Sequence, residues 1–234
     1  MESEQEIFLP TGTARATNTH IVYTLNNLDA IALSMNPGPD KRSDGHNYTK
    51  YYDRHFVPRR YEPLKVLEIG VWEGASLRMW QQYFPQAQIV GADNDITRCI
   101  QPLPERVRLW EMDQSSAESL VNMAKELGPW DIIIDDGSHM PLHQVITFEE
   151  LWPHLNAGGL YCVEDLHVNY HADGSGLMLD YIGSVLQDDL HGLGKTGFAD
   201  WHNSPKEEQA KLYGRELEIE SINLYRYLAI IEKR

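Results

Sequence analysis

Short apolar runs and amphipathic, helix-length segments alternate through the middle of the chain. The amphipathic segments repeat apolar positions three and four residues apart, as a half-buried helix does, over 76–83, 117–127 and 143–154. The apolar runs are too short for helices and predict buried strands over 65–69, 88–92, 107–110, 130–134 and 160–163. Because strands and helices alternate, the pattern predicts right-handed βαβ units in a mostly parallel sheet.

The two ends of the chain add further helices and a hairpin. Helical spacing predicts helices over 19–35, 48–57 and 177–190, and the end of the chain, 217–231, predicts two antiparallel strands around 223–225. At about 150 residues per domain, 234 residues predict one domain. We expect a helical N-terminal cap segment over 1–60 and an α/β core over 61–234.

The charge balance excludes two classes of partner. The chain has 35 acidic and 20 basic side chains, a formal net charge of −15. Binding to nucleic acid or to an anionic membrane rests on clustered Lys and Arg, so we expect neither. Two cysteines cannot form a disulfide framework, the polar start of the chain is unlike a signal peptide, and no apolar run spans a membrane. These features predict a cytoplasmic protein.

A glycine-bearing turn follows the first predicted core strand. Gly70 and Gly74 allow a ligand close to the backbone before the next helix, and Asp93 lies roughly 20 residues further on, where a carboxylate accepts hydrogen bonds from ribose hydroxyls. Trp72 replaces the middle glycine of the dinucleotide fingerprint G-x-G-x-x-G. A ligand with a ribose but no phosphate, such as S-adenosylmethionine, therefore fits better than NAD; an ordinary tight turn is the alternative interpretation.

Carboxylates stand at the carboxyl ends of four successive predicted strands, the edge at which open α/β sheets bind ligands. They are Asp93, Asp113, the pair Asp135 and Asp136, and the pair Glu164 and Asp165. Carboxylate oxygens favour Mg²⁺, Mn²⁺ or Ca²⁺ over zinc. His139 follows Asp136 by three residues, and histidine suits removal of a proton from a hydroxyl that a metal has acidified. Helix caps and loop contacts are the alternative interpretation of each residue taken singly.

These motifs together resemble those of class I S-adenosylmethionine-dependent methyltransferases, and more narrowly the metal-dependent sugar O-methyltransferases of macrolide biosynthesis. The resemblance runs from about Ile31 to the C-terminus. Its most specific part is the Asp-Asp-Gly-Ser-His run that ends at His139, followed by Glu164 and Asp165. The first-strand motif that ends at Gly70 is general to the superfamily. The implied fold is Rossmann-like, a mostly parallel seven-stranded sheet with helices on both faces and an antiparallel C-terminal hairpin.

The resemblance also implies roles for particular residues. Asp136, Glu164 and Asp165 would hold Mg²⁺ or Mn²⁺, and His139 would be the general base. The cofactor S-adenosyl-L-methionine would be bound by Glu68, Gly70, Ser76, Asp93, Asp113, Gln114 and Asp135, under a segment containing Lys41, His46 and Tyr48. His167, Tyr170 and His171, just past the metal ligands, are candidate acceptor contacts. The segments 166–176 and 191–214 match nothing assigned and are expected to form the acceptor pocket or a lid.

The expected function is methyl transfer to a hydroxyl of a small molecule, most simply a sugar of a glycosylated natural product. A catechol or other phenol is the nearest alternative acceptor, because its paired oxygens would chelate the metal equally well. A metal-dependent hydrolase, a nicotinamide-dependent oxidoreductase and a non-catalytic partner-binding domain also remain open. The sequence leaves open whether the chain forms a homo-oligomer.

Overall fold

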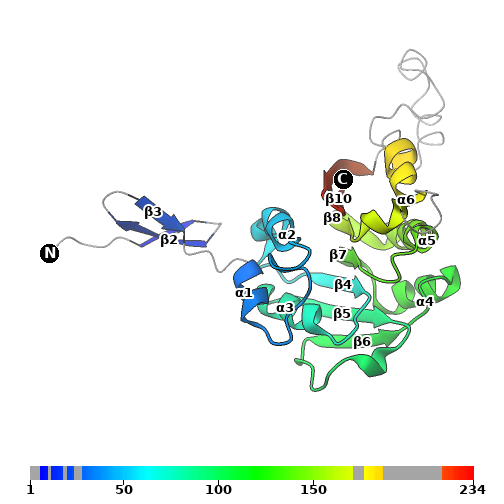
Figure 1. The fold of residues 1–234 in the computed structure, drawn as a ribbon, viewed down its shortest axis with the longest axis horizontal. Coiled ribbons are helices and arrows are strands. Elements are labelled where there is room, and N and C mark those ends of the chain that lie inside the picture. The colour runs from blue at the N-terminus through cyan, green and yellow to red at the C-terminus, as the bar shows by residue number, and fades with distance from the viewer. Residues whose placement is uncertain (1–5, 10–11, 18–19, 24–27, 171–176, 187–217) are drawn as a thin grey trace, which may run out of the picture.

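A seven-stranded sheet forms the centre of the molecule (Figure 1). The computed structural model describes residues 6–9, 12–17, 20–23, 28–170, 177–186 and 218–234. The strands lie in the order β6-β5-β4-β7-β8-β10-β9, in which the first five are parallel and β10 and β9 are antiparallel. Their bounds are β4 Lys65–Ile69, β5 Gln88–Asp93, β6 Val107–Glu111, β7 Trp130–Asp135, β8 Leu155–Val163, β9 Ile219–Tyr225 and β10 Leu228–Lys233. The predicted fold class is confirmed.

Helices cover both faces of this sheet. One group consists of α1 Leu28–Ser34, α2 Thr49–Phe56 and α3 Ala75–Tyr83, and the other of α4 Ala117–Leu127, α5 Pro141–Leu151 and α6 Leu177–Asp180. Short helical turns are η1 Val57–Arg59, η2 Ile96–Arg98, η3 Trp152–His154, η4 Leu166–Tyr170 and the π-helical η5 Tyr181–Leu186. Alternate residues of β7 enter opposite cores: Ile132 and Ile134 join the cluster with α1–α3, and Ile133 joins that with α4–α6.

The chain reverses its direction of progress across the sheet between β4 and β7. From β4 it proceeds outward to β5 and β6, and it returns to β7 on the other side of β4. The loops after β4 and β7 consequently meet above this switch point, where open α/β folds bind ligands. Gly70 is required there: its φ is +87°, and an added Cβ would lie 1.9 Å from the Asp136 carbonyl oxygen.

Two elements differ from the prediction. The helix expected over 19–35 begins only at Leu28. His20–Tyr23 is instead strand β3, which pairs with β2 Gly12–Thr17, and β1 Glu6–Leu9 pairs with β2 to complete a separate three-stranded sheet. The secondary structure of His20–Tyr23 is set by backbone pairing between strands, which helical periodicity in the sequence does not reveal. The C-terminal hairpin turns at 226–227 rather than around 223–225.

Part of the predicted acceptor region falls outside the described residues, namely 171–176 and all of 191–214. Within the described part of the chain, no helix has the length and apolar character needed to cross a membrane.

Candidate functional site

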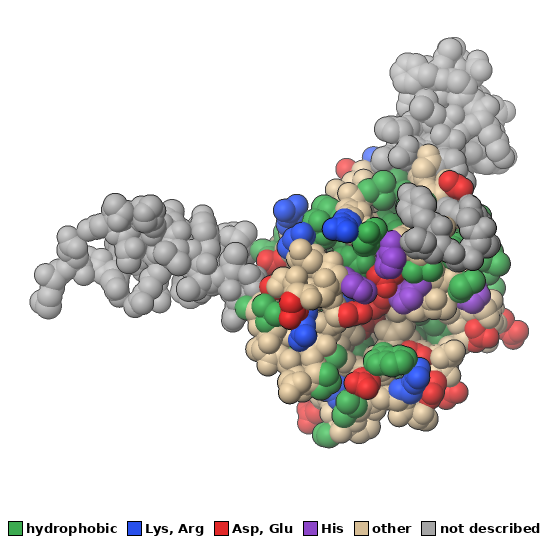
Figure 2. Space-filling model, in the orientation of Figure 1, with side chains coloured by type: hydrophobic (Ala, Val, Ile, Leu, Met, Phe, Trp, Pro, Cys, Tyr) green, Lys and Arg blue, Asp and Glu red, His purple; other side chains and the backbone are tan. Residues whose placement is uncertain are grey.

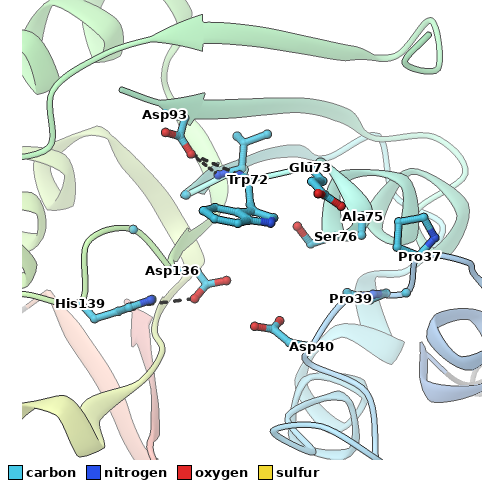
Figure 3. Close-up of a pocket in the computed structure, with 14 residues that line it drawn as sticks. Pro37, Pro39, Asp40, Trp72, Glu73, Ala75, Ser76, Asp93, Asp136 and His139 are labelled. Carbon is cyan, nitrogen blue, oxygen red and sulfur yellow. Dashed lines mark hydrogen bonds and ion pairs between the residues drawn. The ribbon is translucent and has the colours of Figure 1, made fainter. Parts of the chain in front are cut away.

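Two adjoining cavities open at the carboxyl edge of the sheet, on either side of Trp72. The larger, of about 460 Å³, reaches from 37–40 across the loop after β4 to Asp136 and His139 (Figure 3). The smaller, of about 270 Å³, extends over the ends of β5 and β6 to Asp113 and Gln114. Because both are lined by Gly70, Trp72, Asp93 and Gly137, they form two compartments of one groove.

Asp93, at the end of β5, holds the glycine-bearing loop in place. Its Oδ2 accepts hydrogen bonds from the backbone N–H of Val71 at 2.7 Å and of Trp72 at 3.3 Å. The Trp72 side chain is 61% exposed, and the Arg98 guanidinium lies 4.0 Å above its ring. An exposed indole therefore stands between the compartments, directly beside the carboxylate.

The ends of β6 and β7 are joined by an amide. Gln114 Nε2 donates to Asp135 Oδ1 at 2.7 Å, and its Oε1 accepts from the Ser138 backbone at 2.8 Å. Burial of Asp135 raises the pKa of that carboxyl to about 7, against the hydrogen bonds from Gly137 and Gln114, which lower it. Asp113 instead accepts from the Ser115 hydroxyl and backbone, and these bonds lower its pKa. The pKa is therefore raised at the Asp135 carboxyl and lowered at the Asp113 carboxyl.

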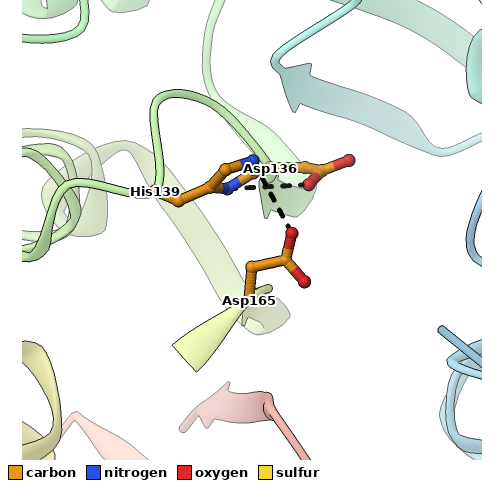
Figure 4. A group of neighbouring side chains, drawn as sticks. All are labelled: Asp136, His139 and Asp165. Atoms are coloured by element: carbon orange, nitrogen blue, oxygen red, sulfur yellow. Dashed lines mark ion pairs between the residues drawn. The ribbon is translucent and has the colours of Figure 1, made fainter. Parts of the chain in front are cut away.

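Three side chains converge where the loops after β7 and β8 meet: Asp136, His139 and Asp165 (Figure 4). Each can offer one ligand atom, and these atoms all lie within 4.8 Å of one another. His139 Nε2 lies 3.6 Å from Asp165 Oδ2, and His139 Nδ1 lies 4.0 Å from Asp136 Oδ1. Two carboxylates and one imidazole therefore face a shared point at the inner end of the larger compartment.

Lys41 lies behind this group and is fully buried. Its ammonium group forms an ion pair with Asp136, and it lies 3.1 Å from Glu164 and 3.4 Å from Glu68. Burial lowers the pKa of Lys41, but the three carboxylates outweigh burial and raise that pKa well above its usual value. Lys41 is thus the internal counter-ion of a buried acidic cluster.

The carboxylates of that cluster are themselves hydrogen-bonded. Tyr52 OH donates to Glu164 Oε1 at 2.6 Å, while the Ser76 hydroxyl and the Trp80 indole N–H donate to Glu68 at 2.7 and 3.0 Å. Burial raises the pKa of Glu164 well above its ordinary value, and the nearby Asp136 adds to the rise. Glu164 therefore faces Lys41 and Tyr52 from inside the protein.

Asp165 accepts a hydrogen bond from one tyrosine and has two further imidazoles beside it. Tyr48 OH donates to its Oδ1 at 2.6 Å, and the Nδ1 atoms of His46 and His167 lie 3.4 and 3.8 Å from the same oxygen. Figure 2 shows histidine side chains gathered beside acidic ones on this face. The arrangement brings the segment before α2 into contact with the loop after β8.

Comparison with known proteins identifies the domain. Residues 67–166 match the family described as a methyltransferase domain. This stretch of the chain is thus similar to known methyltransferase domains. The chain as a whole has methyltransferase relatives. It is similar to the mycinamicin VI 2''-O-methyltransferase of Micromonospora griseorubida, with 44% identity over 53% of this chain and 33% of that protein. It is 32% identical to the 8-demethyl-8-(2-methoxy-alpha-L-rhamnosyl)-tetracenomycin-C 3'-O-methyltransferase of Streptomyces olivaceus, over 88% of this chain and 54% of that one.

A solved structure agrees with this assignment. The MycE methyltransferase from the mycinamycin biosynthetic pathway, in complex with Mg, SAH and mycinamycin VI, matches with a TM-score of 0.73 and 30% identity. The match covers 90% of this chain and 54% of that chain. The chain thus spans between a third and about half the length of the relatives it matches.

The fold brings most of the predicted site residues to one edge of the sheet. Those that line the groove are Gly70, Ser76, Asp93, Asp113, Gln114, Asp136 and His139. Others lie directly behind it or beside Asp165: Lys41, His46, Tyr48, Glu68, Asp135, Glu164, Asp165 and His167. Tyr170 ends η4, and His171 lies outside the described residues.

Two residues are placed differently from what the resemblance implies. Lys41 is directed into the acidic cluster instead of the groove, because the buried Glu68 and Glu164 and the partly buried Asp136 need a cation. The resemblance implies that Asp136, Glu164 and Asp165 hold the metal. Among the described residues, however, the compact group of possible ligands consists of Asp136, Asp165 and His139, without Glu164. The Glu164 carboxylate is engaged by Lys41 and Tyr52, so its role as a ligand stays a prediction.

Sequence reasoning also missed residues that complete the site. Tyr52 had no assigned role, although its place on the apolar face of a helix with Tyr48 and Phe56 is a usable signal: a buried tyrosine hydroxyl requires a partner. Tyr227, in the β9–β10 turn, gave no signal, because its approach to His167 depends on tertiary structure.

Proposed function

We propose that the chain is an S-adenosylmethionine-dependent O-methyltransferase that acts on a hydroxyl of a sugar in a glycosylated natural product. The observation that carries this proposal is the position of Asp136 and His139: they line the larger compartment of the groove and, with Asp165, form the compact group of carboxylate and imidazole. A methyl donor bound in the groove would thus lie next to side chains that are suited to removing a proton from an acceptor hydroxyl. The relatives' names supply the acceptor class.

The groove fits a ligand made of a nucleoside and an amino acid. Asp93 would accept hydrogen bonds from ribose hydroxyls, and the nucleobase would occupy the smaller compartment, which Asp113 and Gln114 line. The amino-acid part would occupy the larger compartment, along the loop from Gly70 to Ser76 at the start of α3. Helix α3 has nine residues, and its free N–H groups suit a carboxylate there.

The carboxylates of Asp136 and Asp165 fit a hard divalent cation, Mg²⁺ or Mn²⁺, and would leave the neighbouring His139 imidazole free to act as a base. When bound, the cation supplies positive charge that lowers the pKa of a nearby acceptor hydroxyl. His139 would take the proton from that hydroxyl, and Asp165, 3.6 Å from its Nε2, would stabilise the resulting imidazolium. In-line positioning of the hydroxyl oxygen against the methyl group would contribute much of the acceleration.

A catechol is the second acceptor class, because its two oxygens would chelate the cation held by Asp136 and Asp165. The relatives favour a sugar: they are named for methylation at the 2'', 2' and 3 positions of glycosylated compounds. Whether the chain assembles into a homo-oligomer stays a prediction.

A turnover screen tests the proposal. The protein is incubated with S-adenosylmethionine and Mg²⁺ against panels of natural-product glycosides and catechols, and methylated products are detected by mass spectrometry. We expect methylated glycosides, loss of product in a chelator, and a reduction of about 10²-fold or more in the His139→Ala variant. Turnover that persists in the chelator contradicts the metal assignment, and full activity of His139→Ala contradicts the base assignment.

A further inference from the structure

The turn between β9 and β10 reaches the reactive group from the far end of the chain. Antiparallel pairing places Ala229 opposite Val163, directly before Glu164. The backbone N–H of Leu166 then donates to the Tyr227 carbonyl at 3.0 Å. The turn is thereby fixed beside the segment that carries Asp165.

Tyr227 adopts a backbone conformation that bulky residues avoid. Its φ is +67°, in the left-handed region, where a side chain with a Cβ is strained. Five non-glycine residues of the described chain have positive φ: Asn47, Trp72, His139, Asp165 and Tyr227. The first four lie in the candidate site or next to one of its residues. Tyr227 is also the second residue of the two-residue turn between β9 and β10, a position that often has positive φ, so this conformation fixes the place of the ring beside the site and does not by itself assign a role.

The Tyr227 ring forms an aromatic surface together with His167. Their ring centroids are 4.6 Å apart, and the Tyr227 side chain remains 39% exposed. His167 Nδ1 lies 3.8 Å from Asp165 Oδ1 and makes no hydrogen bond, while His139 lies on the other oxygen of the same carboxylate. The His46 ring, 6.4 Å from that of His167, continues the surface toward Tyr48.

We propose that Tyr227 and His167 form a wall of the acceptor site, which holds the apolar face of a pyranose ring next to the Asp136–His139–Asp165 group. A pyranose has C–H groups on its faces and hydroxyls around its edge. The aromatic surface complements the first, and the carboxylates complement the second. The proposal rests on the proposed function and assigns its acceptor side to residues from η4 and the C-terminal hairpin.

The experiment measures binding of a minimal acceptor, methyl α-L-rhamnopyranoside, by saturation-transfer NMR. The protein is first loaded with S-adenosylhomocysteine and Mg²⁺. Tyr227→Asn removes the ring, and because Asn tolerates positive φ better than Tyr, this variant should fold at least as well. Tyr227→Phe keeps the ring. Tyr61→Asn, which changes an exposed tyrosine outside both cavities, is the matched control.

We expect Tyr227→Asn to weaken glycoside binding at least fivefold, with Tyr227→Phe and Tyr61→Asn within twofold of wild type. Calorimetric affinity for S-adenosylhomocysteine should be the same in all four proteins, which separates an acceptor contact from a general structural effect. If the loaded wild type gives no glycoside signal, or if Tyr227→Asn binds as wild type does, the proposed wall is refuted. Failure of the wild type to bind S-adenosylhomocysteine would instead refute the proposed function.

Discussion

Replacing Lys41 with Met should be one of the most destabilising single changes in this protein. The ammonium group is fully buried and contacts carboxylates of Glu68, Asp136 and Glu164. Methionine keeps much of the side-chain volume but leaves these carboxylates without their cation. Removing one partner of a buried ion pair costs about 3–5 kcal/mol. Because protonation of the raised-pKa carboxyls relieves part of this cost, we expect a loss of about 3 kcal/mol at pH 7.5.

The size of this loss should depend on pH in a defined direction. The pKa of Lys41 is raised above its usual value, so its stabilising contribution is fully present throughout pH 5–8. In Lys41→Met, the carboxyls of Asp136 and Glu164, whose pKa values burial already raises, would gain further affinity for protons. The folded variant then binds more protons than its unfolded chain, and its stability falls as the pH rises. The gap to wild type should therefore widen from pH 5 to pH 8.

The assay is equilibrium urea unfolding at several pH values, supported by thermal melts. A loss of about 3 kcal/mol corresponds to a fall in Tm of about 6–12 °C for a chain of this length. Lys125→Met, at an exposed position of α4, is the matched control and should stay within about 0.5 kcal/mol of wild type. A Lys41→Met protein within about 1 kcal/mol of wild type, or a gap that narrows toward pH 8, would refute the internal counter-ion.

Three further outcomes follow from the same geometry. In urea unfolding, Asp135→Asn should stabilise the protein by about 2 kcal/mol at pH 8 and by less at pH 5. The reason is that the buried carboxyl, with a pKa of about 7, costs more stability as the pH rises above the pKa that the same group has in the unfolded chain. An equal gain at both pH values would contradict this reasoning. S-Adenosylhomocysteine should change the intrinsic fluorescence of wild type but much less that of Trp72→Phe, since Trp72 is exposed in the groove whereas Trp80, Trp130 and Trp152 are buried; an unchanged response in the variant shows that the ligand binds elsewhere. Asp93→Ala should weaken calorimetric binding of S-adenosylhomocysteine at least tenfold, and wild-type affinity would remove Asp93 from the site.

The core was predictable because its signals are local. The strands over Lys65–Ile69 and Trp130–Asp135 are continuous apolar runs, and helix Ala117–Leu127 has clear periodicity and a following glycine. The carboxylates at the strand ends followed from the βαβ pattern alone, since parallel strands share one carboxyl edge. That edge was enough to place Asp93, Asp136 and His139 on one groove.

The rest depends on contacts between distant segments. From the sequence, Lys41 is expected in a segment that covers the cofactor, and only the tertiary structure shows that it neutralises one carboxylate within β4 and two that follow β7 and β8. Tyr227 is likewise an ordinary turn residue until strand pairing places it on His167. The sequence predicts a helix over His20–Tyr23, where the structure has a strand, because the apolar residues of this segment continue the spacing of the helix that begins at Leu28.

Methyl transfer to a sugar oxygen can be followed with a deuterated methyl group on S-adenosylmethionine, a glycoside acceptor and mass spectrometry. Wild type with Mg²⁺ should transfer the intact CD₃ group to a sugar oxygen. His139→Ala should bind S-adenosylhomocysteine with wild-type affinity but transfer the group at least about 10²-fold more slowly. Transfer to carbon or nitrogen, or undiminished transfer by His139→Ala, would refute the proposed reaction and its base.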